Sequence, residues 1–242
     1  MTEPVRLDDP EVVRREYATE DGLRARVSVY EGVHGPDARD TAFAAVAEVG
    51  PGRVLEVGCG MGEFAQRLAA DLEAEIIAVD LSPRMVELTR ERGVDARVAD
   101  VQQLPFGDGE FDCVCANWVL YHVADVNQGV SELARVLRPG GRLVAATLFN
   151  ENLLELWELL GGNTDRRLSF DSENGGPALE RHFAHVERRD AFGTVIFPDT
   201  EAMRRFVAVT ITHAHLADRV PVLTEPFRAR SRHAVFVAER AA

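Results

Sequence analysis

The stretch RVLEVGCGMG, residues 53–62, decides the fold of this chain. Its first half is a short apolar run rich in β-branched residues, which is typical of a buried strand. Three glycines follow at alternate positions, and residues 62–71 then show the apolar spacing of a helix. This order predicts the first strand, turn and helix of an α/β sheet, with a ligand bound at the carboxyl end of the strand.

Strand and helix patterns alternate on the C-terminal side of this stretch. We expect strands at residues 53–57, 75–80, 96–98, 111–116, 142–148, 185–197 and 234–238. Helices are expected between these strands. One has Ser82 as its N-cap, and another ends at residues 138–141, which contain the sequence Pro-Gly-Gly. Such alternation implies right-handed crossovers. It therefore predicts a doubly wound, Rossmann-like α/β fold with a mostly parallel seven-stranded sheet and a helical lid insertion.

The predicted organisation is one domain over residues 1–242. Residues 1–50 are expected to form an N-terminal helical lid, and residues 51–148 the ligand-binding core. Residues 149–182 break the alternation with an apolar helical run and two glycine pairs, which indicates a lid insertion near the site. Residues 183–242 are expected to complete the sheet with strands and a helix.

Charge and cysteine content limit the kinds of partner. Lysine and arginine number 27 against 40 aspartates and glutamates, a net charge of −13, which disfavours binding to nucleic acid or a membrane surface. Three cysteines do not suggest a disulfide framework, residues 1–4 do not resemble the start of a signal peptide, and no apolar run is long enough for a membrane span. These features favour a cytoplasmic protein; the sequence leaves open whether it forms a homodimer.

The glycine turn favours a cationic ligand. Gly58, Gly60 and Gly62 are spaced G-x-G-x-G, whereas a dinucleotide-binding turn is spaced G-x-G-x-x-G. Glu56 precedes them, and its carboxylate would repel a pyrophosphate, with no lysine or arginine from residue 54 to 66 to offset it. S-adenosylmethionine carries a sulfonium and an ammonium, so this carboxylate would attract it. The turn therefore favours S-adenosylmethionine over a nicotinamide dinucleotide.

Two further acidic positions suit an adenosyl ligand. Asp80 ends the second predicted strand about 20 residues after the glycines, where a carboxylate can accept hydrogen bonds from a ribose diol. Asp100, with Val101 and Gln102, follows the third and can face an adenine amine. Each has a purely structural alternative: Asp80 can be an acid at a helix N-terminus, and Asp100 a turn residue.

Several ordered motifs together resemble one family. They are LEVGCGMG (55–62), VDLS (79–82), Asp100 with LPF (104–106), FD (111–112) and LARVLRPGG (133–141). Over residues 53–147 the chain resembles the class I S-adenosylmethionine-dependent methyltransferase family, in particular its small-molecule, type 11-like branch.

The resemblance implies a cofactor and a set of residues that bind it. The cofactor is S-adenosylmethionine, released as S-adenosylhomocysteine. Residues 56–62, with Glu56, Gly58, Cys59, Gly60 and Gly62, would contact the methionine part, and Asp80 would contact the ribose. Asp100, Val101 and Gln102 would contact the adenine, with Leu81 and Met85 beside it. Asn117, Trp118 and His122 would lie near the sulfonium and the acceptor.

Methyl transfer asks little covalent chemistry of the protein, because the sulfonium is already a good leaving group. Alignment of the three reacting atoms and exclusion of water are the main requirements. A hydroxyl, phenol or ammonium acceptor also loses a proton, and His122 is the candidate general base. Its alternative is a packing role at a helix start. Whether a base is used, and whether oxygen, nitrogen or carbon is methylated, stays open.

Other candidate groups lie outside the core. Tyr17, Arg24, Arg26 and Tyr30 fall in the expected lid, where an arginine can bind the donor carboxylate or simply face solvent. His213 and His215 form a His-x-His pair, but no third ligand is identifiable, so no metal site is predicted. Cys113 and Cys115 alternate on one strand and are expected in the core.

Four functions compete at this stage. The favoured one is in-line transfer of a methyl group to a small molecule. RNA, DNA or protein methylation is weakened by the acidic charge and by Asn117-Trp118-Val119-Leu120, which is not the Asn/Asp-Pro-Pro-aromatic motif of base-amino methylation. A non-catalytic S-adenosylmethionine-binding protein and a nicotinamide dehydrogenase are the others.

Overall fold

A computed structural model of the chain describes residues 6–163 and 167–242. The expectation drawn from residues 1–4, and residues 164–166 of the predicted insertion, lie outside the described residues.

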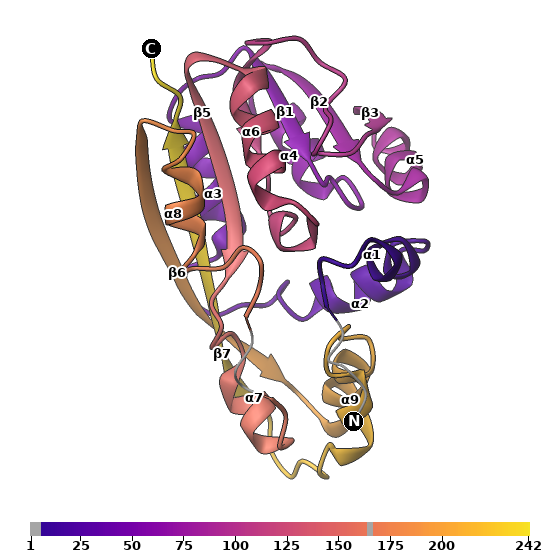
Figure 1. Ribbon diagram of the computed structural model, residues 1–242. Coiled ribbons are helices and arrows are strands. Elements are labelled where there is room, and N and C mark those ends of the chain that lie inside the picture. Colours follow the sequence, from indigo (N-terminus) through magenta and orange to yellow (C-terminus); the bar gives the residue numbers. More distant parts are fainter. Residues whose placement is uncertain (1–5, 164–166) are drawn as a thin grey trace.

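The described strands form one seven-stranded sheet in the order β3-β2-β1-β4-β5-β7-β6 (Figure 1). Strands β1 to β5 run parallel, and β7 pairs antiparallel with both β5 and β6. The predicted fold class is therefore confirmed. The strand bounds are β1 Arg53–Val57, β2 Glu75–Asp80, β3 Asp95–Val98, β4 Phe111–Cys115, β5 Leu137–Leu148, β6 His185–Phe197 and β7 Phe227–Glu239.

Two strands begin earlier than the sequence indicates. The turn expected at residues 138–141 lies inside β5, because Leu137 already pairs with Phe111 and the register shifts before Cys113. Gly140 accommodates this irregularity with a φ of 70°. Strand β7 starts at Phe227 rather than near residue 234, because it pairs with β6 along its whole length. Pairing with the neighbouring strand thus extends β5 through Gly140 and Gly141, and it extends β7 through the polar residues before residue 234.

Helices cover both faces of the sheet. Residues alternate between the faces along β1, so that Val54 packs with one helical layer and Leu55 with the other. The layer over Val54 contains α3 Ala38–Ala47, α4 Glu63–Asp71 and α5 Pro83–Glu91; the layer over Leu55 contains α6 Val126–Val136 and α8 Gly175–Leu179.

The parts expected to form a lid divide between two roles. Helices α1 Pro10–Glu16 and α2 Asp21–Ser28 lie across the carboxyl ends of β1 and β2 (Figure 1). Helix α3, also inside the predicted lid at residues 1–50, instead packs its alanines on the sheet. The prediction was wrong there, because Ala42, Ala45 and Val46 give α3 an apolar face that the sheet buries.

The predicted insertion at residues 149–182 is divided in the same way. Helix α8 packs on α6 and β6 and does not line the site. Helix α7 Leu154–Leu159 belongs to a third apolar cluster with α9 Thr200–Ala208, the 3₁₀ helix η2 Ala214–Arg219 and the far ends of β6 and β7 (Figure 1). This cluster closes one end of the site. No helix among the described residues combines the length and apolar character needed to cross a membrane.

Candidate functional site

A cavity of about 570 Å³ lies at the carboxyl ends of β1, β2 and β4. It brings together residues far apart in the sequence, as expected for a doubly wound sheet. Twelve of the fourteen predicted site residues line it: Glu56, Gly58, Cys59, Gly60, Asp80, Leu81, Asp100, Val101, Gln102, Asn117, Trp118 and His122.

Gly62 and Met85 do not line this cavity. Gly62 has a φ of 78°, and a Cβ there would lie 2.7 Å from the Thr89 hydroxyl oxygen, so this glycine allows α4 to pack on α5. The Met85 side chain is fully buried. Both residues therefore pack within the fold, and a contact of either with the cofactor stays a prediction.

The glycine loop holds its shape through main-chain contacts. Gly58 has a φ of 73°, and a Cβ at this position would lie 2.5 Å from Val119. The Gly58 and Cys59 N–H groups donate to the Val79 carbonyl at 2.8 and 3.1 Å. At Gly60 a Cβ would come within 3.2 Å of Leu23 on α2. Glycine is thus required where the loop passes between β2 and the lid helices.

Asp80 organises this loop. One carboxylate oxygen accepts from the Gly60 N–H and the other from the Ser82 N–H, both at 2.9 Å. Burial raises the pKa of Asp80, while these backbone hydrogen bonds oppose the rise. A carboxylate oxygen can accept more than one hydrogen bond, so the residue retains capacity toward a ligand in the cavity.

Glu56 is more deeply buried than its predicted role suggests. Its side chain is 3% exposed, and its Oε2 has no hydrogen-bond partner. Burial, and next the charge of Asp80, raise the pKa of Glu56 well above its usual range. The expectation of a fixed negative charge is therefore revised: burial shifts the equilibrium of Glu56 toward the protonated acid, and a cation beside it would shift the equilibrium toward the carboxylate.

The cavity has an apolar and amide-rich end beside β2 and β3. Leu81 is 42% exposed, which leaves its side chain free to contact a flat ligand. The Asp100 carboxylate accepts from the Gln102 N–H at 2.8 Å and from the Gln102 amide at 3.2 Å. Buried Val101 lies between them. These contacts form an Asx turn, so the structural alternative for Asp100 and a ligand role coexist.

His122 joins the N-terminal segment to the site. Its Nδ1 lies 2.9 Å from the Leu7 carbonyl oxygen, and its Nε2 lies 2.8 Å from the Tyr17 hydroxyl. A carbonyl only accepts, so Nδ1 carries the proton and Nε2 accepts from Tyr17. Burial lowers the pKa of His122 to about 4, so the ring is neutral at neutral pH. Its basic nitrogen is therefore engaged by Tyr17 in this arrangement.

The lid helices are fixed to the core by other polar contacts. The Ser82 hydroxyl donates to the Tyr17 carbonyl at 2.6 Å, and Arg84 donates two hydrogen bonds to Glu20 at 2.9 and 3.0 Å. Arg26 on α2 donates to the Val209 carbonyl at 2.8 Å, and its buried second terminal nitrogen has no partner. Tyr17, Arg26 and Tyr30 line the cavity, but Arg24 does not.

The C-terminal part of the chain forms a wall of the cavity that the sequence motifs do not predict. These residues carry no motif, and His233 is placed there by the pairing of β7 with β5. The only local signal is an isolated histidine in an apolar strand. The missed lining residues include Asn152, Trp157, Thr210, Ser231 and His233.

No metal centre is visible among residues 6–163 and 167–242, where no group of three or more His, Cys, Asp or Glu side chains is placed to hold an ion. His213 is buried and stacks on Trp157 at 4.3 Å between ring centroids. It also lies 2.7 Å from the Thr212 hydroxyl. The three cysteines are buried free thiols, and Cys113 and Cys115 pack in the core as expected.

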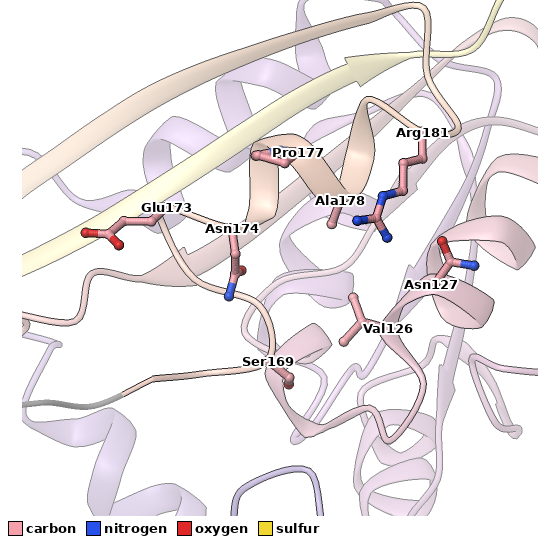
Figure 2. A pocket seen from close by; sticks show the side chains of 8 residues that line it. All are labelled: Val126, Asn127, Ser169, Glu173, Asn174, Pro177, Ala178 and Arg181. Carbon is pink, nitrogen blue, oxygen red and sulfur yellow. The ribbon is translucent and has the colours of Figure 1, made fainter.

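A second hollow of about 490 Å³ lies between α6 and α8 (Figure 2). Its lining includes Asn127 and Arg181, which reach toward each other across the hollow in Figure 2. None of the predicted site residues lies there, and it is separate from the strand ends. The first cavity is therefore the candidate cofactor site.

The fold and this cavity place the chain among the doubly wound α/β proteins that bind ligands at the carboxyl ends of their strands. A family described as "Methyltransferase domain" matches residues 55–145. A malonyl-[acyl-carrier protein] O-methyltransferase from Enterobacter lignolyticus is 32% identical over 171 residues, covering 67% of this chain and 66% of that protein. A probable tocopherol O-methyltransferase from rice is 41% identical over 123 residues, covering 46% and 34%.

Solved structures agree on the fold. A structure titled as the [4+2]-cyclase SpnF matches with a TM-score of 0.64 at 20% identity, covering 100% of both chains. A Haemonchus contortus phosphoethanolamine N-methyltransferase 2 bound to S-adenosyl-L-methionine matches with a TM-score of 0.63 at 18% identity, covering 99% of this chain and 61% of that one. At such identities these matches establish the architecture alone.

The chain belongs to the class I S-adenosylmethionine-dependent methyltransferase family, whose cofactor is S-adenosylmethionine. It spans between one third and two thirds of the length of the curated relatives described above. The activity and the acceptor are treated below as proposals.

Proposed function

We propose that this chain transfers the methyl group of S-adenosylmethionine to a small-molecule acceptor. The observation that carries the proposal is the convergence of twelve predicted site residues, from the ends of several strands, on one cavity. Relatives named as tocopherol, malonyl-[acyl-carrier protein] and ubiquinone/menaquinone methyltransferases support an acceptor that is small or carried on a small group.

The arrangement suits the parts of the donor. Glu56 and the unpartnered nitrogen of Arg26 offer opposite charges for the ammonium and the carboxylate of the methionine part. Asp80 is placed to accept from the ribose hydroxyls beside the glycine loop. Leu81 offers an apolar surface to the adenine, and Asp100 an acceptor for its amine.

In the transfer, a lone pair of the acceptor forms a bond to the methyl carbon as the carbon–sulfur bond breaks. The bonding pair stays on sulfur, which becomes the neutral thioether of S-adenosylhomocysteine. A low-dielectric cavity suits this step when the nucleophile is anionic, because charge is dispersed in the transition state. The proposed role of the chain is alignment and exclusion of water, with Trp118 beside the transferred group.

His122 is retained as the candidate general base. Its Nε2 accepts a hydrogen bond from Tyr17, so this hydrogen bond must break before Nε2 can take a proton from the acceptor. The absence of nucleic-acid binding and a cytoplasmic location remain predictions, and the oligomeric state stays open. The buried free thiols are the observation that supports a reducing compartment.

Two experiments test the proposal. Calorimetry should show binding of S-adenosylhomocysteine and none of NADH; the reverse result would overturn the cofactor assignment. Incubation with donor labelled in the methyl group and a panel of small-molecule extracts should then yield labelled product. A protein that binds the donor but labels nothing across phenolic, carboxylic, amine and RNA acceptors would instead be a binding protein or catalyse another reaction on this fold.

A further inference from the structure

His233 is a buried histidine that the cofactor contacts proposed above do not use. It lies in β7, opposite Leu148 of β5, and its side chain lines the cavity. The residue is only 7% exposed, and neither ring nitrogen has a hydrogen-bond partner. A buried imidazole without partners loses its hydration and gains nothing in return until a ligand supplies the missing bonds.

Aromatic side chains hold this ring in place. Trp118 and Tyr30 both meet His233 edge to face, with ring centroids 5.5 and 5.3 Å apart. The Trp118 indole N–H is buried and also has no partner. Trp118 and Leu153 are the non-glycine residues with positive φ among those that the structure describes, and both line this cavity. Backbone strain of this kind is concentrated at ligand sites.

The surroundings of this polar pair are mostly apolar. Val33, Leu148, Leu153 and Phe206 all contribute to the same cavity wall. The nearest charged groups neutralise each other, since Arg39 donates to the Asp37 carboxylate at 2.6 Å. A few polar atoms within an apolar wall are typical of a pocket for a small organic molecule.

We propose that His233 and Trp118 form the polar end of the acceptor subsite, and that the acceptor is an apolar molecule bearing a hydroxyl group. This inference rests on the proposed methyl transfer and narrows it to oxygen. A hydroxyl oxygen can accept from the Trp118 N–H while its own hydrogen is donated to the unprotonated nitrogen of His233.

Other head groups fit these atoms less well. An ammonium has only donors, and the Trp118 N–H would face it with another donor. A carboxylate at this end would lack a cation of its own, because Arg39 is paired with Asp37 and Arg26 is assigned above to the carboxylate of the donor. A carbon nucleophile would satisfy neither nitrogen of His233. In the transfer to a hydroxyl, oxygen gains the methyl group, sulfur keeps the electron pair, and the hydroxyl proton passes to His233, which then replaces His122 as the proton acceptor.

The test uses four probes that share one ring system: naphthol, naphthoate, naphthylmethylamine and naphthalene. Their binding to the full chain saturated with S-adenosylhomocysteine is measured by calorimetry. Naphthol should bind at least about fivefold more tightly than each of the others, the difference expected from one or two net hydrogen bonds. The variant His233→Phe, which keeps a ring but no nitrogen, should reduce this preference to less than about twofold.

Two controls separate folding and cofactor binding from acceptor recognition. His185→Phe changes an exposed histidine at the start of β6 and should keep the naphthol preference. S-adenosylhomocysteine affinity, measured first, should be unchanged in His233→Phe; if that variant does not fold, His233→Leu, which also has no hydrogen-bonding group, replaces it. Failure of the wild-type chain to bind S-adenosylhomocysteine would count against the proposed function itself.

With the cofactor bound, several results would overturn the hydroxyl subsite alone. They are equal affinity for the four probes, no binding of any of them, a preference for the amine or the carboxylate, or a naphthol preference that survives in the His233 variant.

Discussion

The pH dependence of cofactor binding follows from the burial of Glu56. The pKa of the Glu56 carboxyl is raised first by burial and then by the charge of Asp80. An ammonium placed beside it would lower that pKa, so binding should release a proton. Affinity should therefore rise with pH between the lower pKa of the bound state and the higher pKa of the free state, and level off above the latter. The variant Glu56→Gln should abolish this rise.

The size of the change in affinity with pH follows from the attraction between the Glu56 carboxylate and the ligand ammonium in a buried site. A carboxylate and an ammonium about 4 Å apart attract by roughly 4 kcal/mol at an effective dielectric constant of about 20. Desolvation of the ammonium removes part of this, which leaves about one to two pKa units, each worth about 1.4 kcal/mol. Affinity should thus increase about 10- to 100-fold across the window, with a slope of at most tenfold per pH unit.

Calorimetry with S-adenosylhomocysteine at several pH values, in buffers of different ionisation enthalpy, measures both the slope and the released proton. Methylthioadenosine is the matched ligand, because it has the adenosine and the thioether but no ammonium. It should bind with little pH dependence. The reasoning is refuted if Glu56→Gln keeps the wild-type slope, or if methylthioadenosine shows the same slope as S-adenosylhomocysteine.

Three further outcomes are expected. Asp80→Ala should weaken S-adenosylhomocysteine binding at least about tenfold in calorimetry and lower the free energy of unfolding by about 2–4 kcal/mol in denaturant titrations, because the Gly60 and Ser82 N–H groups lose their acceptor; wild-type affinity would contradict the assignment. If His122 is the general base, His122→Ala should lower kcat about 100-fold or more, whereas Tyr17→Phe, which frees Nε2, should not; equal losses would mean that the pair only clamps the lid. The pKa of His122 is lowered from 6.5 to about 4. The stability contributed by the neutral ring is therefore complete above about pH 6.5 and is lost as the pH falls toward 4, a loss of about 3 kcal/mol that thermal melts should show to be smaller in His122→Ala.

Motif order and periodicity were sufficient to predict that residues distant in the sequence meet at one cavity. The glycine loop, Asp80 and Asp100 all lie at strand ends, and a parallel sheet brings strand ends to one edge whatever the details of packing. The same logic does not separate a lining residue from a packing residue. Gly62 and Met85 belong to the same motifs, yet one faces Thr89 and the other is fully buried.

The charge state of Glu56 and the engagement of His122 could not be predicted from residue identity. Both depend on how much water the fold removes and on partners distant in sequence, such as Leu7 and Tyr17 for His122. A pKa measures that environment and not the side chain alone.

The sequence by itself determined the alternation of strands and helices in the parallel core, the glycine loop and the family, because these depend on local periodicity and on short motifs. Only the tertiary structure decided which residues close the acceptor side. The antiparallel pairing of β7 with β5 brings His233 to the cavity that also receives Trp118, and α2 lies over the glycine loop. Leu148 and His233 are 85 residues apart in the sequence, and Trp118 and His233 are 115 apart. The register of such contacts is fixed by packing across the whole sheet rather than by the residues on either side in the sequence.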